Sequence, residues 1–252
     1  MPDRKRIDYE TAARPKIFGQ GITSLLVRGR FVKAFSILFS IAIDYLSNLC
    51  CYVFYRHVVK KSFSYKNTSL RYAIRLRHST WVSERSLELS LFKYILDSSP
   101  HHNMIEIGNV LHNYYNCSHV VIDKYDASHN VIISDIMDYN EFDIYDLAIS
   151  ISTLEHIGLD ESDLDDNKAI YAIEHILRLL KNGGKFIFSI PFGYNIPLDN
   201  YVLNNDRIDC SFFKRFGMLS WKQVDESELA GCGYEVGKWK VNAVIIGTIV
   251  KE

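Results

Sequence analysis

Apolar positions follow two different periods between residues 79 and 250. Short apolar runs, each the length of a buried strand, occur at 104–107, 119–123, 131–134, 145–151 and 185–190. Between these runs, apolar residues recur every three or four positions, which predicts helices over 79–96 and 167–180. The Asn-Gly-Gly sequence at 182–184 is expected to end the second helix. Alternating strands and helices predict a parallel sheet.

The C-terminal part breaks this alternation. A short helix is predicted near 222–231, and two apolar runs at 234–241 and 243–250 are close enough to pair as a hairpin. The predicted fold class is therefore α/β: a doubly wound, Rossmann-like sheet with an antiparallel C-terminal edge hairpin, preceded by a helical N-terminal extension.

The extension contains an almost wholly apolar stretch at residues 31–55. Its length alone would permit a membrane span of about 20 residues. Asp44, however, lies near its middle, and a charge there costs roughly 2.5–3.5 kcal/mol on insertion scales. We expect either an in-plane or re-entrant helix pair with basic flanks, or a buried helix that covers the following domain or a dimer interface.

Lysine and arginine are concentrated in the N-terminal part of the chain. Residues 1–77 hold 15 Lys/Arg against 4 Asp/Glu, whereas residues 78–252 hold 14 against 26. We predict a basic, apolar helical extension over 1–77, with a poorly ordered arm over 1–30, and an α/β domain over 78–252. Residues 1–61 are the expected contact with an anionic membrane surface.

The cysteines and the start of the chain indicate a compartment. Five cysteines without CxxC spacing disfavour a disulfide framework or a zinc site. The first thirty residues are basic and polar and do not resemble a cleavable signal peptide. We therefore predict a cytoplasmic protein that is peripheral at the membrane; its oligomeric state is not predicted.

Three acids close successive predicted strands: Glu106, Asp123 and Asp135. The carboxyl ends of parallel strands line one edge of an open sheet, where ligands bind. An acid at the position of Asp123 suits both hydroxyls of a ribose, and Asp135 suits the exocyclic amine of adenine, with Ile136 against the ring. The first turn, GNVLHN, has the single glycine Gly108. This disfavours NAD and ATP, which need a glycine-rich phosphate loop, and favours a nucleoside such as S-adenosylmethionine.

The motifs EIGNVL (106–111), IDKYD (122–126), STLEHIG (152–158) and GGKFIFSIPFGYN (183–195) resemble those of class I S-adenosylmethionine-dependent methyltransferases. More narrowly, they resemble methyltransferase-like proteins of surface-polysaccharide biosynthesis. The chain departs from the glycine-rich first loop of that class, since only its first glycine is present. The resemblance implies these cofactor contacts: Glu106, Gly108, Asn109, Asp123, Lys124, Asp135, Ile136 and Ser152.

Residues after the fourth and fifth strands are the candidates for chemistry. His156 suits a general base because its ordinary pKa of about 6.5 is near working pH, and Glu155 would orient it or act as the base itself. Each has a structural alternative, such as packing at a helix start. Tyr194 and Asn195 are expected at an acceptor pocket, with Lys214 and Arg215 as a clamp for an anionic acceptor or, alternatively, as a solvated pair.

The acidic segment 159–167 lacks EF-hand spacing, so no metal site is predicted. The predicted function is methyl transfer from S-adenosylmethionine to an oxygen or nitrogen of a glycan or sugar-derived acceptor, including a lipid-linked one. The alternative is a non-catalytic protein of the same fold that serves as a scaffold for membrane glycan enzymes. Nucleic acid is disfavoured as a partner, because the catalytic half is acidic.

Overall fold

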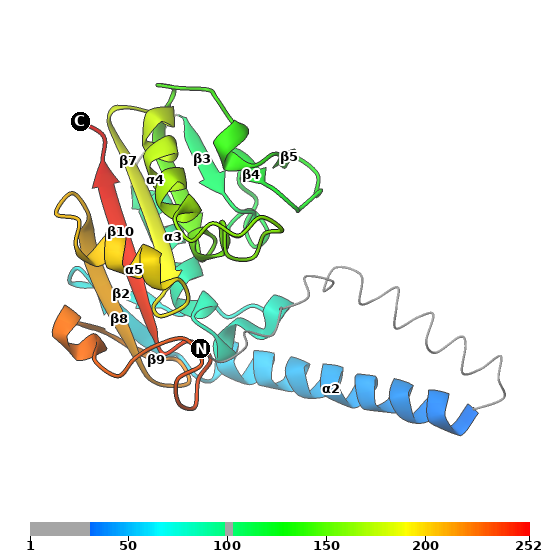
Figure 1. Ribbon diagram of the computed structural model, residues 1–252. Coiled ribbons are helices and arrows are strands. Elements are labelled where there is room, and N and C mark those ends of the chain that lie inside the picture. The colour runs from blue at the N-terminus through cyan, green and yellow to red at the C-terminus, as the bar shows by residue number, and fades with distance from the viewer. Residues whose placement is uncertain (1–30, 99–102) are drawn as a thin grey trace. The chain divides into compact units, whose positions relative to one another are not determined.

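The computed structural model describes residues 31–98 and 103–252 (Figure 1). The chain divides into two compact units at Val58/Val59. The predicted basic arm over 1–30 lies outside the described residues. The predicted boundary after residue 77 differs from this division, because the hairpin of β1 (Ser62–Tyr65) and β2 (Thr68–Arg71) packs within the second unit. The rings of Phe63 and Phe213, for example, lie 5.9 Å apart.

The second unit is built on an eight-stranded mixed sheet in the order β5-β4-β3-β6-β7-β10-β8-β9. Its strands are β3 (Met104–Ile107), β4 (Val120–Asp123), β5 (Ile132–Ile133), β6 (Tyr145–Ile151), β7 (Leu180–Pro191), β8 (Asp209–Gly217), β9 (Ser220–Val224) and β10 (Ala243–Val250). The first five strands of that order are parallel, and β10, β8 and β9 are antiparallel. The predicted doubly wound, Rossmann-like fold is confirmed.

The strand order places a switch point between β3 and β6. From β3 the chain moves through β4 to β5 on one side, and then returns to β6 and β7 on the other. The connections at the carboxyl ends of β3 and β6 therefore leave in opposite directions, which opens the crevice where sheets of this type bind ligands. The predicted cofactor and catalytic residues lie at or just after the carboxyl ends of β3, β4, β5 and β6.

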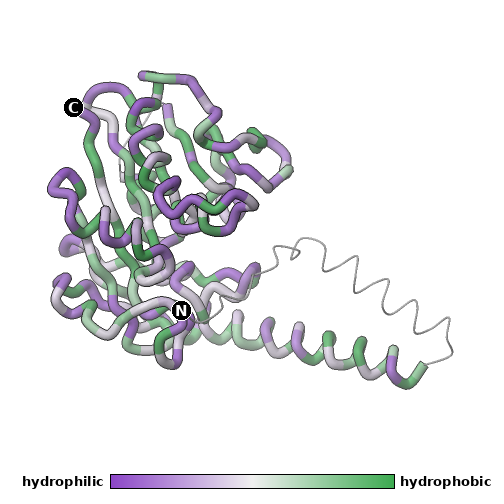
Figure 2. Tube along the Cα trace, in the orientation of Figure 1, coloured by the Kyte–Doolittle hydropathy of each residue, from purple (hydrophilic) through white to green (hydrophobic). Residues whose placement is uncertain are grey.

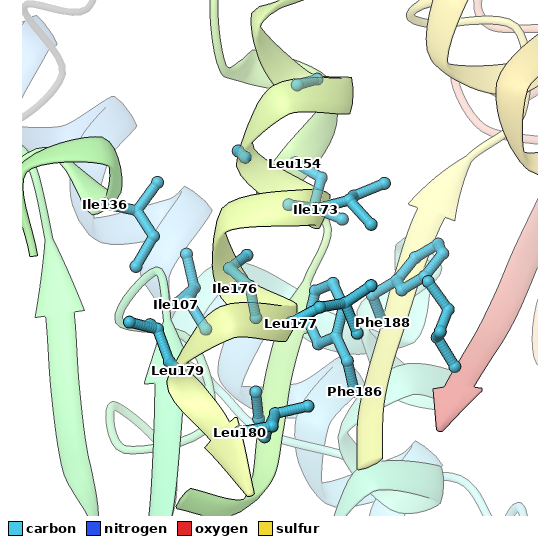
Figure 3. Packing of buried hydrophobic residues seen from close by; sticks show 14 of the residues in the cluster. Ile107, Ile136, Leu154, Ile173, Ile176, Leu177, Leu179, Leu180, Phe186 and Phe188 are labelled. Carbon is cyan, nitrogen blue, oxygen red and sulfur yellow. The ribbon is translucent and has the colours of Figure 1, made fainter. Parts of the chain in front are cut away.

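The helices of this unit are α3 (Arg85–Ser98), α4 (Lys168–Leu179) and α5 (Ile196–Leu203). Short 3-10 segments lie at η2 (Arg77–Val82), which is kinked, η3 (Ile136–Asp138), η4 (Leu154–His156) and η5 (Glu226–Leu229). Figure 2 shows the apolar segments of the sheet. The buried stripe of α4, which includes Ile173, Ile176 and Leu177, packs with Phe186 and Phe188 of β7 in one core cluster (Figure 3). This packing holds the end of β6, and η4 with it, in a rigid frame.

The C-terminal elements differ from the sequence prediction in their residues. The antiparallel edge hairpin exists, but β8 and β9 form it. Residues 234–241 form no strand, and β10 is inserted between β7 and β8 because it is apolar on both faces, as a central strand must be. The predicted helix over 222–231 is reduced to η5. Residues 182–184 lie within β7, since α4 ends at Leu179.

The first unit contributes the helix α2 (Phe31–His57), which is 27 residues long. It is one continuous helix, so the prediction of a re-entrant helix pair over 31–55 is wrong. Among the described residues, α2 is long and apolar enough to cross a membrane, which for a single helix near the N-terminus is weak evidence. Asp44 lies in its middle and is exposed.

Candidate functional site

Gly108 ends β3 at the switch point and faces the end of β6. Its φ of +84° is in the left-handed region, which glycine adopts without strain. A Cβ at this position would lie 2.2 Å from Oγ1 of Thr153. Gly108 therefore serves close packing between the two strand ends, and the Thr153 side chain fills the space that its missing side chain leaves.

Glu106 anchors the first loop from within the core. It is fully buried, and its carboxylate accepts hydrogen bonds from the backbone N–H groups of Val110, Leu111 and His112. His119 Nε2 lies 2.7 Å from its Oε2. Four protein groups surround this carboxylate, so Glu106 anchors the first loop.

Asp123 shapes the turn that follows β4. Its Oδ1 accepts from the backbone N–H groups of Tyr125 and Asp126, each at 2.8 Å, and its Oδ2 accepts from the Asn109 N–H at 3.0 Å. Oδ2 thus retains capacity for a further donor. The side-chain amide of Asn109 donates to Asp126 at 2.9 Å, whereas its buried Oδ1 has no hydrogen-bond partner among the described residues.

Asp135 belongs to a four-residue ion-pair cluster with Lys124, Glu161 and Lys168. Its Oδ2 lies 2.9 Å from Lys124 Nζ and 2.7 Å from Lys168 Nζ, and both amines also contact Glu161. Burial opposes ionisation of Asp135, but hydrogen bonds from Lys168 and Lys124 outweigh it and lower the pKa to about 2. Among the described residues, the Met137 N–H is the only donor to Oδ1.

This cluster links the turn after β4 to the acidic segment 159–167. Within that segment, Glu161 pairs with both lysines. Ile136, in η3, is 4 % exposed and packs in the core (Figure 3). Its side chain thus contributes to the core.

Ser152, after β6, is tied to the sheet and to α3. Its backbone N–H donates to Ser189 O at 3.0 Å, and its hydroxyl donates to the buried carboxylate of Glu88. Ser189 donates to the same Glu88 oxygen, and Arg85 lies 3.2 Å from the other one. This buried network fixes the backbone from which η4 begins, and so positions Glu155 and His156.

His156 is held between three polar side chains. Its Nδ1 is hydrogen-bonded to Asp160 Oδ2, which also accepts from the Tyr194 hydroxyl at 2.6 Å. Its Nε2 lies 3.6 Å from Glu155 Oε1. Burial acts to lower the pKa of His156, but the hydrogen bond to Asp160 and the charge of Glu155 raise it overall. The ring meets Tyr194 edge to face, with centroids 4.8 Å apart.

Glu155 is almost completely removed from solvent, with 1 % of its surface exposed. Burial raises its pKa to about 8, against the opposing charge of His156. Its Oε2 is buried without a hydrogen-bond partner among the described residues. This shift favours the protonated form of Glu155, which can donate a hydrogen bond.

A cavity of about 310 Å³ opens at the carboxyl ends of β6 and β7. It is lined by Val82, Ser83, Glu84, Arg85, Ser152, Glu155, His156, Pro191, Tyr194, Arg215, Tyr234, Lys240 and Val241. Of the predicted cofactor contacts only Ser152 reaches it; the others lie on the side of the switch point toward β4. The two catalytic candidates, Glu155 and His156, both line the cavity.

The four predicted acceptor residues are not brought together. Tyr194 and Arg215 line the cavity. Asn195 is fully buried and caps α5, where its Oδ1 accepts from the Leu198 N–H. Lys214 donates to Glu228 O at 2.6 Å and does not line the cavity. Because successive side chains of a strand point to opposite faces, the predicted Lys214–Arg215 clamp is not formed.

Sequence reasoning missed Asp160, Tyr234 and Lys240. Asp160 follows His156 by four residues, a spacing that would have indicated a contact within one turn. Tyr234 and Lys240 come from the segment that was assigned to a strand. Tertiary packing brings the Tyr234 ring and the Lys240 ammonium to the cavity, so no local sequence signal identifies them.

The polar groups at the switch point fit a ligand rich in hydrogen-bond donors. Asp123 Oδ2 and Asp135 Oδ1 each retain accepting capacity, and Asn109 Oδ1 is a buried acceptor without a partner among the described residues. Hydroxyl, amine and ammonium groups would satisfy these oxygens, as those of a nucleoside with an amino-acid chain would.

The sequence matches no protein-family profile and has no significant match among curated proteins. Among solved structures, the chain is similar to the N-methyltransferase NodS from Bradyrhizobium japonicum bound to S-adenosyl-L-homocysteine, with 15 % identity, a TM-score of 0.41, and 67 % of this chain and 87 % of that chain covered. A sugar N-methyltransferase from Streptoalloteichus shows 10 % identity, a TM-score of 0.35, and coverage of 70 % and 90 %. At such scores the similarity transfers no ligand or reaction.

Proposed function

We propose that the protein transfers a methyl group from S-adenosylmethionine to an oxygen or nitrogen of an acceptor held in the cavity. The observation that supports this best is the placement of His156 after β6. It lies beside the switch point, lines the cavity, and is hydrogen-bonded through Nδ1 to a carboxylate. Methyl transfer to a hydroxyl or amine requires a base that lies between the cofactor and the acceptor and removes the acceptor's proton.

Three oxygens on the β4 side of the switch point would hold the cofactor: Asp123 Oδ2, Asp135 Oδ1 and Asn109 Oδ1. S-Adenosylmethionine supplies a methyl group already activated by its sulfonium centre. What the protein must contribute is alignment, and the buried network of Glu106 and the packing of Gly108 on Thr153 make this edge rigid.

His156 is the proposed base. A carboxylate can only accept, so the contact with Asp160 assigns the proton to Nδ1 and leaves Nε2 as the basic nitrogen. Nε2 can then accept the proton that the acceptor hydroxyl or amine loses. Burial favours the protonated form of Glu155, which reduces its competition for that proton.

The proposed acceptor is a glycan or sugar-derived molecule, including a lipid-linked one. Tyr194 and Tyr234 line the cavity with their rings 4.6 Å apart, edge to face, and such surfaces suit the apolar face of a sugar ring. We also propose that residues 1–61 bring the protein to the cytoplasmic membrane face. The exposed apolar side chains of α2 and the basic residues Arg56, Lys60 and Lys61 support this contact.

The reaction is tested first by calorimetric titration with S-adenosylmethionine and S-adenosylhomocysteine. We expect wild type to bind both, Asp123→Ala to lose binding, and His156→Ala to keep it, because His156 is placed on the acceptor side. Lys222→Ala, an exposed position on β9, is the matched control. The absence of binding to wild type at millimolar ligand would overturn the proposal.

The membrane proposal has its own test. Full-length protein and a variant lacking residues 1–61 are floated with vesicles that contain anionic lipid. We expect only the full-length chain to float, and to float less at high salt because exposed charges are screened. Equal recovery of both proteins in the soluble fraction would contradict membrane contact.

A second candidate is a scaffold of the same fold without catalysis. Two observations favour it. The side chain of Thr153 packs directly on Gly108, the glycine of the first loop, and the amines of Lys124 and Lys168 form ion pairs with Asp135, the proposed cofactor contact. A scaffold predicts no binding of either cofactor form, so the same titration separates the two functions.

A further inference from the structure

The cavity contains a buried cation that forms no ion pair with any described residue. Arg215 is 7 % exposed. Its Nε donates to Gly217 O at 3.3 Å and its Nη2 to Val82 O at 2.9 Å, both neutral acceptors. A guanidinium carries five N–H donors, so these bonds leave donors for a ligand.

Two tryptophan rings hold the guanidinium in place. Its central carbon lies 3.9 Å from the ring centroid of Trp239 and 5.3 Å from that of Trp221. Rings attract the cation without neutralising it. Burial lowers the pKa of Arg215, and the nearby Glu84 only partly offsets this effect. A buried, fixed and only partly compensated charge is costly, and an anion that enters the cavity would reduce that cost.

Neither acid that lines the cavity, Glu84 or Glu155, forms an ion pair with Arg215 among the described residues. Burial and the neighbouring charge of Glu88 raise the pKa of Glu84, and burial raises that of Glu155 to about 8. Both are thus shifted toward the neutral form. A second cation, Lys240, is exposed, lines the cavity, and lies 5.2 Å from the ring centroid of Tyr234. No described carboxylate forms an ion pair with it.

We propose that Arg215 and Lys240 bind a phosphate group carried by the acceptor, with Tyr194 and Tyr234 beside the attached ring. This inference rests on the proposed function, because it names the acceptor class of the same cavity. The planar fork of Arg215 matches two phosphate oxygens, and the ammonium of Lys240 balances the second charge of a phosphomonoester. A carboxylate, with one charge, would leave one cation uncompensated.

The phosphate has two sources, a sugar phosphate and a lipid phosphate. The test is calorimetric titration of the full chain, without cofactor and at constant ionic strength set by KCl. The probes are glucose, glucose 1-phosphate, inorganic phosphate and dihexanoyl phosphatidic acid below its micelle concentration. We expect at least one phosphate probe to bind about tenfold or more tighter than glucose. Tightest binding of glucose 1-phosphate or of phosphatidic acid supports a sugar-borne or a lipid-borne phosphate, respectively.

Variants identify the subsite. We expect Arg215→Gln to weaken phosphate binding at least about tenfold. Lys240→Gln should weaken it less, by about threefold or more, because Lys240 is exposed and solvent ions screen its charge. Arg215→Lys keeps the charge and is expected to retain part of the affinity, and circular dichroism verifies that each variant is folded. Lys214→Gln is the matched control, since this neighbour on β8 does not line the cavity and should bind like wild type.

Equal affinity for glucose and all phosphate probes would overturn the inference, as would equal losses in Lys214→Gln and Lys240→Gln. These outcomes are separate from the fate of the proposed function. If wild type binds S-adenosylhomocysteine but does not prefer phosphate, only the phosphate subsite fails. If it prefers phosphate but binds neither cofactor form, only methyl transfer fails.

Discussion

Replacing Glu155 with Gln should change how the stability of the protein depends on pH. Burial raises the pKa of this carboxyl from its ordinary value of 4.5 to about 8. Between these two values the folded protein keeps a proton that the unfolded chain has released. Stability attributable to Glu155 is therefore fully present below pH 4.5, falls as pH rises toward 8, and is constant above it.

The size of this effect follows from the shift. Each pKa unit corresponds to about 1.36 kcal/mol, so the shift from 4.5 to about 8 corresponds to roughly 4–5 kcal/mol of stability lost across this interval. Glutamine has nearly the shape of the protonated acid and cannot ionise. We expect Glu155→Gln to match wild type near pH 4.5 within about 1 kcal/mol and to become more stable than wild type by roughly 4–5 kcal/mol at pH 8.

The assay is urea unfolding, followed by circular dichroism, at half-unit steps from pH 4.5 to 9. Glu226→Gln is the control, because it makes the same substitution at an exposed position. Its stability should run parallel to that of wild type. A constant difference between Glu155→Gln and wild type over the whole range would refute the claim that Glu155 is held protonated by burial.

Two further substitutions test the other parts of the site. Gly108→Ala should lower the free energy of unfolding by about 2–5 kcal/mol, from roughly 1–2 kcal/mol for the left-handed backbone and roughly 1–3 kcal/mol for overpacking on Thr153. Adding Thr153→Ala to that variant should recover only the part due to overpacking. A free energy of unfolding in urea that stays within about 0.5 kcal/mol of wild type for Gly108→Ala would contradict this packing argument. If the proposed reaction is correct, Asp160→Asn should shift the acidic limb of the rate profile to lower pH, because Asp160 helps to raise the pKa of His156. His156→Gln should slow turnover by about 100-fold or more with little change in cofactor affinity. An unchanged pH profile in Asp160→Asn would exclude Asp160 as a positioning residue.

Much of the fold followed from local sequence pattern. The runs at 104–107 and 145–151 are mostly apolar and have the length of strands, which predicts buried strands, and the spacing of apolar residues in α4 predicts one buried face. These patterns depend only on which residues are apolar and how far apart they are. The position of β10 between β7 and β8 depends on contacts with distant strands, which a local pattern does not contain.

The candidate site divides in the same way. The sequence by itself determined that acids end the strands and that His156 and Glu155 follow the fourth one, because strand ends are local features. Only the tertiary structure decided which groups those acids meet: Glu106 meets backbone amides, Asp135 meets two lysines, and Asp123 keeps one free accepting position. Partner choice depends on distances between segments far apart in the chain.

Arg215 and Lys214 show the physical reason most clearly. The two residues are adjacent in sequence and equal in charge, so the sequence does not show which of them faces a ligand. The alternation of side chains along β8 places them on opposite faces. One donates to a backbone carbonyl near η5, and the other is buried between two tryptophans at the cavity. The sequence determined that two cations are present. The tertiary structure decided which of them can meet a ligand, because burial and the direction of a side chain are set by the elements packed around it.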